Sequence, residues 1–444
     1  ATVTAVEAAS MLMRALGYFQ YQNDYQDGFE LSTVRQGTKI GIFDGVGSSA
    51  TEPMTRNQVA QMVLNALQSA VVEPDGNTIN LTTPEGQVYT GKVNYVSVTS
   101  SKPFATAISR TTATSVGSQN DGYIVELGER LYDGKLKLND DQIDDFGRPS
   151  RLWEFDGKEI GTYMKKELIR QEWSVKVTGK MLYDLLTKGT LEDRNYKFYI
   201  YVDGETTSGV LGDAYFTTAD LNKNNNDKVG ATGNGVLTQV FVDSDEKEVT
   251  IAVINTYLAK ANADYSDKKD EVSFKVWGID NKSTPSAPVY VKTLTANKDD
   301  YENIPVAGED FSIKDVKEGD AYLVNVASGE IQIMKPADVI SAATLSAFSK
   351  GNYVVSDGTQ YDYAQAIEYD PEVLEQWTNS VINLKDREYN LYLDTYGYVL
   401  GVDLVEAIDN YLFITGIDDG TSNLAATNFK ANAIFLDGTM KTIE

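Results

Sequence analysis

Residues 41–67 read GIFDGVGSSATEPMTRNQVAQMVLNAL, a glycine-rich turn followed by a helical pattern. Thr55 stands where a helix N-cap is expected, and Gln58 follows three residues later, which is the spacing of a capping box. The apolar residues after the cap recur at helical spacing on one face: Val59, Met62, Val63, Ala66 and Leu67. This stretch predicts an amphipathic helix with a well-defined start.

The same pattern occurs about fifty residues earlier. Residues 3–18 read VTAVEAASMLMRALGY, and an offset of 51 aligns Thr4 with Thr55 and Glu7 with Gln58. The helical positions that follow also match: Ala9 with Ala60, Met11 with Met62, Ala15 with Ala66 and Leu16 with Leu67. Two capped helices that share one apolar pattern form an internal repeat.

This pair of helices, with Gly-Ile-Phe preceding Thr55-Arg56 of the second helix, resembles the S-layer homology repeat. That module fastens bacterial surface proteins to wall polysaccharide. The resemblance covers residues 1–72 and implies an all-α helical-bundle region there, made of the end of one repeat and one full repeat. Between the two capped helices, residues 34–42 are expected to form a shorter helix closed by Gly41 and Gly45.

The resemblance also implies a polymer-binding site at Thr55, Arg56, Asn57 and Gln58. The family motif is usually Thr-Arg-Ala-Glu, and its arginine lies in a groove between repeats against an acidic, typically pyruvylated, wall polysaccharide. Arginine suits this role because its planar fork of donors matches a carboxylate, and a helix N-terminus favours an anion. Thr55 is the cap rather than a ligand. The alternative is that Arg56 is only an exposed first-turn residue.

Two departures from the family motif affect this expectation. Gln58 replaces the usual glutamate, which preserves the capping geometry and removes a charge. The first repeat has Ala5 where the second has Arg56, so it is expected to serve as a scaffold.

The whole chain has 444 residues, too many for one core, so two to four domains are expected. Its 39 basic and 65 acidic residues leave a net charge of −26, which disfavours nucleic acid and anionic membranes as partners. Cysteine and histidine are absent. Disulfides, thiolate or histidine zinc sites, and catalysis through histidine or cysteine are therefore excluded.

The two ends of the sequence favour truncation. No apolar run is long enough for a transmembrane segment, and the first residues lack the basic and apolar regions of a signal peptide. The chain starts within a repeat and stops within a strand pattern. We expect a signal peptide and a further repeat upstream.

After residue 72 the sequence becomes β-rich. Short alternating stretches predict mostly antiparallel, sandwich-like α+β modules over residues 73–205, 206–285 and 286–415, with the start of another over 416–444. The clearest hairpins pair 236–242 with 249–254 and 389–393 with 398–404. A strand running into a short helix is expected over 175–186, and a short helix near 336–348. The 27 tyrosines fit β-rich extracellular modules, with an aromatic carbohydrate-binding platform as the alternative.

Three stretches within residues 110–420 resemble surface proteins of Gram-positive gut clostridia: DDFGRPSRLWEF, NGVLTQVFVD and REYNLYLDTYGYVLG. Such proteins carry S-layer homology repeats followed by β modules. This resemblance implies no particular chemistry.

A second candidate site is an asparagine-rich loop with oxygen ligands at alternate positions: Asp220, Asn222, Asn224 and Asn226. This spacing matches the first half of a calcium loop. It is not an EF-hand, because no glycine occupies the sixth position and Ala231 stands where a glutamate should close the loop. An irregular Ca²⁺ site and a flexible polar loop are the two alternatives.

No pattern in the sequence points to an enzyme. Acidic pairs such as Asp140-Asp141, Asp144-Asp145 and Asp418-Asp419 lie in turn-like sequence, where aspartate stabilises the turn itself. The resemblance implies a secreted Gram-positive structural protein, held non-covalently on secondary cell-wall polysaccharide and self-assembled into an S-layer or similar array. The alternatives are a monomeric wall-anchored adhesin that binds glycans or proteins, and a wall-attached glycoside hydrolase.

Overall fold

The structure is a computed structural model that describes residues 2–75, 80–82, 88–90, 93–98, 114–115, 123–207, 214–244, 246–277, 291–297, 313–349, 352–365, 387–405, 412–418, 430–435 and 440–443. The chain divides into two compact units. The first comprises Ala1–Asp338, Tyr363–Glu368 and Tyr392–Leu400, and the second comprises Val339–Asp362, Tyr369–Leu391 and Gly401–Glu444.

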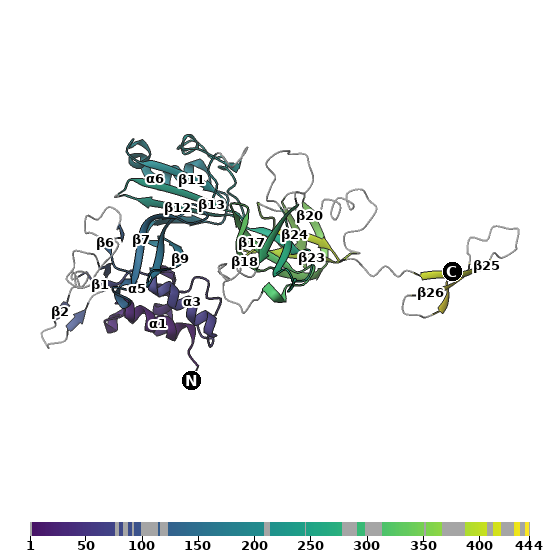
Figure 1. Ribbon diagram of the computed structural model, residues 1–444, viewed down its shortest axis with the longest axis horizontal. Helices are drawn as coiled ribbons and strands as arrows, with labels where there is room; N and C mark the ends of the chain where they lie inside the picture. Colours follow the sequence, from purple (N-terminus) through teal and green to yellow (C-terminus); the bar gives the residue numbers. More distant parts are fainter. Residues whose placement is uncertain are drawn as a thin grey trace. The chain divides into compact units, whose positions relative to one another are not determined.

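The first unit begins with three helices, α1 (Ala5–Leu16), α2 (Phe29–Lys39) and α3 (Arg56–Leu67), with a 3₁₀ turn, η1 (Gln22–Tyr25), before α2 (Figure 1). Both capped helices start where the sequence predicts. The helix expected over 34–42 instead begins at Phe29 and ends at Lys39. Met62 and Ala66 of α3 are buried as expected, whereas Val59 and Val63 remain 38% and 37% exposed.

The helices share their core with the chain segments that follow them in the sequence. Val71, Val98 and Val125 are buried against them and form a closed ring of backbone hydrogen bonds. Val71 N–H donates to Val125 O (2.8 Å), Val125 N–H to Val98 O (3.1 Å), and Val98 N–H to Val71 O (2.7 Å). The elements around this ring are β1 (Val72–Pro74), β4 (Tyr95–Ser97), β6 (Tyr123–Ile124) and α5 (Leu127–Leu131). β1 pairs with β4, β2 (Asn80–Thr82) with β3 (Val88–Thr90), and β5 (Thr114–Ser115) with β6, all antiparallel.

Two sheets follow along the chain (Figure 1). The first is an antiparallel meander of β7 (Leu136–Ile143), β8 (Pro149–Phe155) and β9 (Lys158–Met164). After the 3₁₀ turn η2 (Lys166–Leu168) comes a four-stranded sheet, in the order β10 (Ile169–Trp173), β12 (Leu237–Asp243), β13 (Glu248–Ile254) and β11 (Lys197–Val202). The predicted hairpin of 236–242 with 249–254 is confirmed as β12 and β13, while β11 joins β13 in parallel.

A helix covers one face of the four-stranded sheet. This helix, α6 (Gly179–Glu192), packs Leu182 and Leu186 against the strands. A strand was expected to run into a helix over 175–186, but residues 175–178 are not a strand and the helix continues to Glu192. The 3₁₀ turn η4 (Thr218–Asp220) precedes the asparagine-rich loop.

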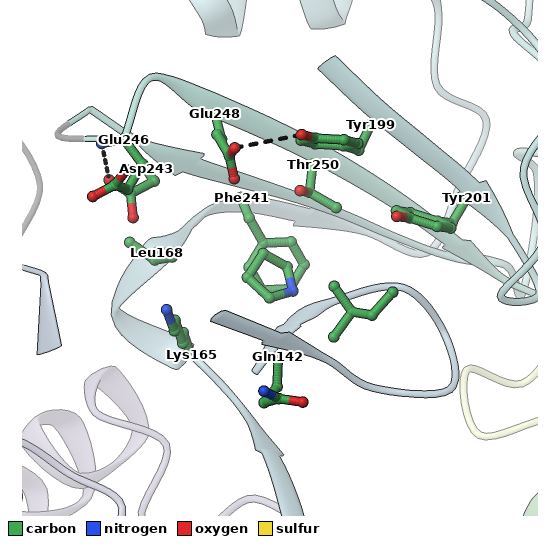
Figure 2. A pocket seen from close by; sticks show the side chains of 12 residues that line it. Gln142, Lys165, Leu168, Tyr199, Tyr201, Phe241, Asp243, Glu246, Glu248 and Thr250 are labelled. Atoms are coloured by element: carbon green, nitrogen blue, oxygen red, sulfur yellow. Dashed lines mark hydrogen bonds between the residues drawn. The ribbon is translucent and has the colours of Figure 1, made fainter. Parts of the chain in front are cut away.

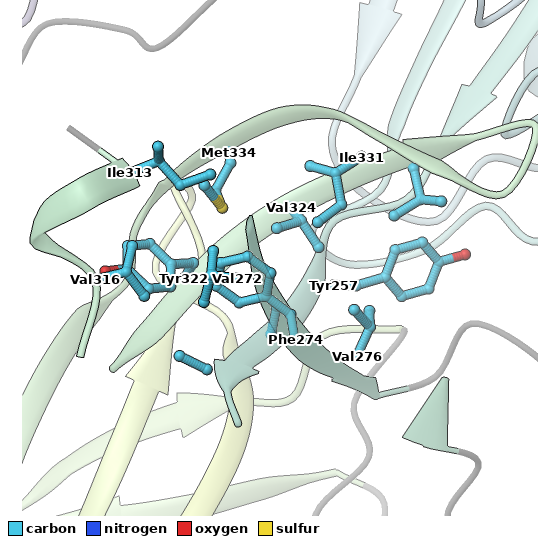
Figure 3. Close-up of a cluster of buried hydrophobic side chains, with 13 residues drawn as sticks. Tyr257, Val272, Phe274, Val276, Ile313, Val316, Tyr322, Val324, Ile331 and Met334 are labelled. Atoms are coloured by element: carbon cyan, nitrogen blue, oxygen red, sulfur yellow. The ribbon is translucent and has the colours of Figure 1, made fainter. Parts of the chain in front are cut away.

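A five-stranded antiparallel sheet holds a third large apolar cluster of the first unit. Its order is β16 (Val291–Asn297), β15 (Glu271–Trp277), β14 (Tyr257–Ala261), β17 (Ala321–Ala327) and β18 (Glu330–Pro336). The rings of Phe274 and Tyr322 meet edge to face, 5.6 Å apart, within this cluster (Figure 3). The 3₁₀ turn η5 (Ile313–Asp315) contributes Ile313 to the same core.

The second unit contains two three-stranded antiparallel sheets. One is β20 (Leu345–Ser349), β21 (Tyr353–Ser356) and β22 (Thr359–Asp362); the other is β25 (Leu412–Asp418), β26 (Lys430–Phe435) and β27 (Met440–Ile443). A further sheet of β19 (Asp338–Ala343), β23 (Tyr389–Leu393) and β24 (Val399–Leu404) has residues in both units.

The helix expected near 336–348 is wrong, because β19 and β20 occupy that stretch. Ala342 has a φ of 54°, which a helix does not tolerate, and its N–H donates to Asn390 Oδ1 at 3.2 Å. Leu345–Ser349 pairs with β21 through backbone hydrogen bonds. Sheet pairing therefore overrides the local alanine-rich pattern.

The expectation of a β-rich chain with mostly antiparallel sheets is confirmed at this coarse level, and the N-terminal helical part is modest. The all-α bundle of repeats over residues 1–72 stays a prediction. The sandwich-like packing and the module boundaries at residues 72, 205, 285 and 415 stay predictions. In the described part of the chain, helices are too short or too polar to cross a membrane.

Candidate functional site

Both predicted capping boxes are present. Thr55 Oγ1 accepts a hydrogen bond from Gln58 N–H (3.3 Å), and Gln58 Oε1 accepts one from Thr55 N–H (2.9 Å). Thr4 and Glu7 make the same reciprocal pair, at 3.4 and 2.9 Å. Thr55 and Gln58 thus use their side chains to start α3, as the sequence predicts.

The two capped helix starts lie side by side. Residues 3–4 run antiparallel to residues 53–54: Thr4 bridges Pro53, and Met54 N–H donates to Val3 O at 3.0 Å. Val6 N–H also donates to Ala50 O at 2.9 Å. The starts of α1 and α3 are therefore gathered at one end of the helical region, where the helix dipoles attract negative charge.

Arg56 is the first residue of α3 and is exposed. It makes no ion pair or hydrogen bond within the described residues, so its guanidinium is available to a ligand. Asn57 beside it is also exposed. Of the four predicted polymer-binding residues, Arg56 and Asn57 thus face solvent, while Thr55 and Gln58 are engaged in the cap.

A buried asparagine, missed by the sequence analysis, fixes the turn before this helix. Asn65 is 3% exposed, and its Nδ2 donates to Ile42 O (3.0 Å) and to Asp44 O (2.8 Å). Gln58 Nε2 donates to Gly47 O at 3.4 Å, which ties the same turn to the cap. The position of Asn65 on the inner side of the helix was the signal in the sequence that could have identified this contact. A buried side-chain amide generally bonds to backbone groups that lack another partner.

Two pockets lie beside α2, and neither was expected. One has a volume of about 470 Å³ and is lined by Arg35, Lys39 and Tyr95; the other, of about 430 Å³, is lined by Lys39, Lys166 and Asp44. Arg35 pairs with Asp27 (2.6 Å) and Lys166 with Asp44 (3.4 Å). Lys39 lines both pockets and makes no ion pair within the described residues. Arg56 lines neither of them.

Tyr95 of β4 lines the pocket of about 470 Å³ and links β4 to the segment between α1 and α2. Its hydroxyl donates to Asp24 Oδ2 (2.6 Å) and accepts from Gln20 N–H (2.9 Å). Burial, together with the hydrogen bond to Asp24, raises the pKa of Tyr95 far above its ordinary value. The hydroxyl therefore stays protonated and holds the segment between α1 and α2 in place.

The asparagine-rich loop uses several of its oxygens internally. Asp220 Oδ2 accepts from Thr217 N–H (2.8 Å) and Thr217 Oγ1 (3.1 Å), and Asn222 Oδ1 accepts from Asn224 N–H (3.1 Å). Asn225, which was not predicted as a ligand, donates from Nδ2 to Asp220 O (2.8 Å). Asn224 and Asn226 are exposed. Ca²⁺ binding by this loop stays a prediction, and the region that the structure describes contains no cluster of three acidic groups placed to hold a metal.

No protein-family model matches the chain, and no curated protein matches it.

Proposed function

We propose that this chain is a secreted structural protein of a Gram-positive bacterial surface, held on acidic cell-wall polysaccharide by its N-terminal helices and assembled into an S-layer or similar array. The observation that carries the proposal is the pair of adjacent helix starts that share a capping-box geometry, one of which presents the unpaired Arg56. The resemblance of residues 1–72 to S-layer homology repeats supports the same reading.

The electrostatics favour an anionic ligand at this end of the chain. The protein as a whole carries a charge of −26, so an acidic polymer would be repelled by most of its surface. Arg56, an unpaired arginine beside two helix N-termini, can instead attract such a polymer locally. Its guanidinium can hold a carboxylate through two parallel hydrogen bonds. Lys39, in the pockets beside α2, is another cation that makes no ion pair within the described residues.

A monomeric wall-anchored adhesin is the second candidate. A tyrosine-lined pocket between two sheets of the first unit favours it.

The test compares binding of the whole chain to cell walls before and after chemical removal of their secondary polysaccharide. We expect Arg56→Ala to weaken binding by about 10- to 100-fold, because hydrogen bonds to charged groups contribute roughly 1.5–3 kcal/mol. Arg56→Lys should recover part of the loss, since it keeps the charge without the planar fork.

Arg194→Ala is the matched control, because Arg194 is also an exposed arginine and its loss changes the net charge equally. Unchanged wall binding by Arg56→Ala would remove Arg56 from the site. Equal binding to walls with and without the polysaccharide would overturn the proposed function.

A further inference from the structure

A pocket of about 440 Å³ lies between the four-stranded sheet and the first strands of the meander (Figure 2). Figure 2 shows Tyr199, Thr250 and Tyr201 along one side, and Gln142 and Lys165 along the other. All the residues that line it belong to the first unit. It is separate from the helix starts and from the asparagine-rich loop.

The alternation of β11 explains why two tyrosines face this pocket. Successive side chains of a strand point to opposite faces of the sheet. Ile200 and Val202 pack into the core beneath α6, so Tyr199 and Tyr201 project from the opposite face. Thr250 of β13 pairs with Tyr199 and lies on the same face.

The two tyrosines form a short aromatic row at the edge of the sheet. β11 is an outer strand, and Tyr199 remains 37% exposed. Residues two apart in a strand are separated by roughly 6.6 Å, so the rings follow one another along the pocket. Gly147 abuts the Tyr201 ring: a Cβ there would lie 2.2 Å from Tyr201 Cγ. This contact holds the second ring in place.

The polar groups of the pocket are mostly acceptors. The lining includes the carboxylates of Asp243, Glu246 and Glu248 and the single ammonium of Lys165. Glu248 Oε1 is 3.1 Å from Lys197 Nζ and 3.4 Å from the Tyr199 hydroxyl. Thr250 is only 6% exposed, lines the pocket, and has no side-chain hydrogen bond with any described residue. A negatively charged ligand would be repelled here, whereas one rich in hydroxyl groups would find acceptors.

We propose that this pocket binds a neutral oligosaccharide, with sugar rings against Tyr199 and Tyr201 and sugar hydroxyls donating to the carboxylates and meeting Thr250. A pyranose matches both parts of the lining, because its C–H face is apolar and its rim is a ring of hydroxyls. The ligand class differs in charge from the acidic polymer assigned to Arg56. The proposal therefore does not depend on the proposed wall-binding function.

The experiment titrates the whole chain by isothermal calorimetry with neutral tetrasaccharides of glucose, of galactose and of N-acetylglucosamine. The expected result is saturable binding of at least one of them. Tyr199→Ala should weaken that binding about tenfold, and Tyr199→Phe should retain most of it, because the ring face makes the contact. Tyr132→Ala is the control, since Tyr132 is similarly exposed and packs on Phe155, away from the pocket.

Glu248→Gln provides a second variant on the polar side of the same pocket. It should weaken binding of the neutral sugar, because a charged acceptor is replaced by a neutral one. Absence of binding for all three tetrasaccharides would overturn the proposal. So would equal affinity in Tyr199→Ala, tighter binding of an oligogalacturonate at this pocket, or binding of an extended peptide along β11 in place of the sugar.

Discussion

At the scale of single residues, one difference between the two caps has a measurable consequence. Glu7 accepts hydrogen bonds from the backbone and hydroxyl of Thr4, and these lower the pKa of Glu7 from its ordinary 4.5, with the backbone bond as the larger cause. Gln58 performs the same role at Thr55 without a titratable group. The stability contributed by the first cap should therefore depend on pH in the acidic range, whereas that of the second should not.

We expect the contribution of Glu7 to stability to be lost as the pH falls. A carboxyl whose pKa is lowered by folding stabilises the fold above its unfolded pKa, and that stabilisation disappears as the pH falls through the folded value. Glu7→Gln should therefore remove part of the decline in unfolding free energy below pH 4.5, while Gln58→Glu should add to it. Urea titrations of the three proteins at several pH values measure this; parallel profiles would contradict the expectation.

A second residue-scale comparison concerns two turns of the form Asp-x-aromatic-Gly. Asp144 Oδ1 accepts from the N–H groups of Phe146 (3.0 Å) and Arg148 (2.9 Å), and Asp394 Oδ1 does the same with Tyr396 (2.8 Å) and Tyr398 (2.9 Å). Asp144 also pairs with the Arg148 guanidinium (2.6 Å). In the second turn Tyr398 stands at the position that Arg148 has in the first, and it offers no cation. Burial raises the pKa of the Asp394 carboxyl above its ordinary value.

At the scale of elements, α6 shows how one glycine joins a helix to a distant loop. Gly179 is the first residue of α6, and a Cβ there would lie 2.0 Å from Asp220 O and 2.5 Å from Asn225 Nδ2. Lys180 N–H donates to Asn225 O at 2.7 Å. The start of the helix and the asparagine-rich loop are therefore packed backbone to backbone.

Two alanine substitutions in this helix should have opposite signs. Gly179→Ala should lower the free energy of unfolding by about 1–3 kcal/mol, because the loop must move to admit the methyl group. Gly189→Ala, at an exposed position of the same helix, should raise it by about 0.5–1 kcal/mol, since alanine has the higher helix propensity. Urea denaturation measures both, and stabilisation by Gly179→Ala would show that the loop is not held as described.

At the scale of the whole molecule, the charge of −26 bears on self-assembly. Copies of so acidic a chain repel one another, and divalent cations reduce that repulsion. Exposed strand edges can pair between copies through main-chain hydrogen bonds once the charges are screened.

Electron microscopy of the purified chain with and without millimolar Ca²⁺ tests the array. We expect regular sheets or filaments that disperse on chelation. Equal concentrations of Mg²⁺ are the control, and Asp220→Ala would report whether the asparagine-rich loop is involved. Single particles in every condition would contradict the array and favour the adhesin.

The sequence by itself determined the features whose causes lie within a few residues. The two helix caps follow from Thr-x-x-Glu and Thr-x-x-Gln, and the hairpin of β12 with β13 follows from two short apolar and β-branched runs on either side of a polar stretch. The turn at Asp156-Gly157 has positive φ at both positions, 49° and 78°, as an Asp-Gly pair between strands predicts. The exposure of Arg56 at the start of α3 is another feature that follows from the local sequence.

Only the tertiary structure decided the features that join distant parts of the chain. The ring of Val71, Val98 and Val125, the anchoring of the turn by Asn65 and the parallel pairing of β11 with β13 depend on segments far apart in sequence. The pocket at Tyr199 needs strands from two sheets. Local patterns specify which side of a strand or helix is apolar, but the partner that covers that side is chosen by packing across the whole unit, and no short stretch of sequence encodes it.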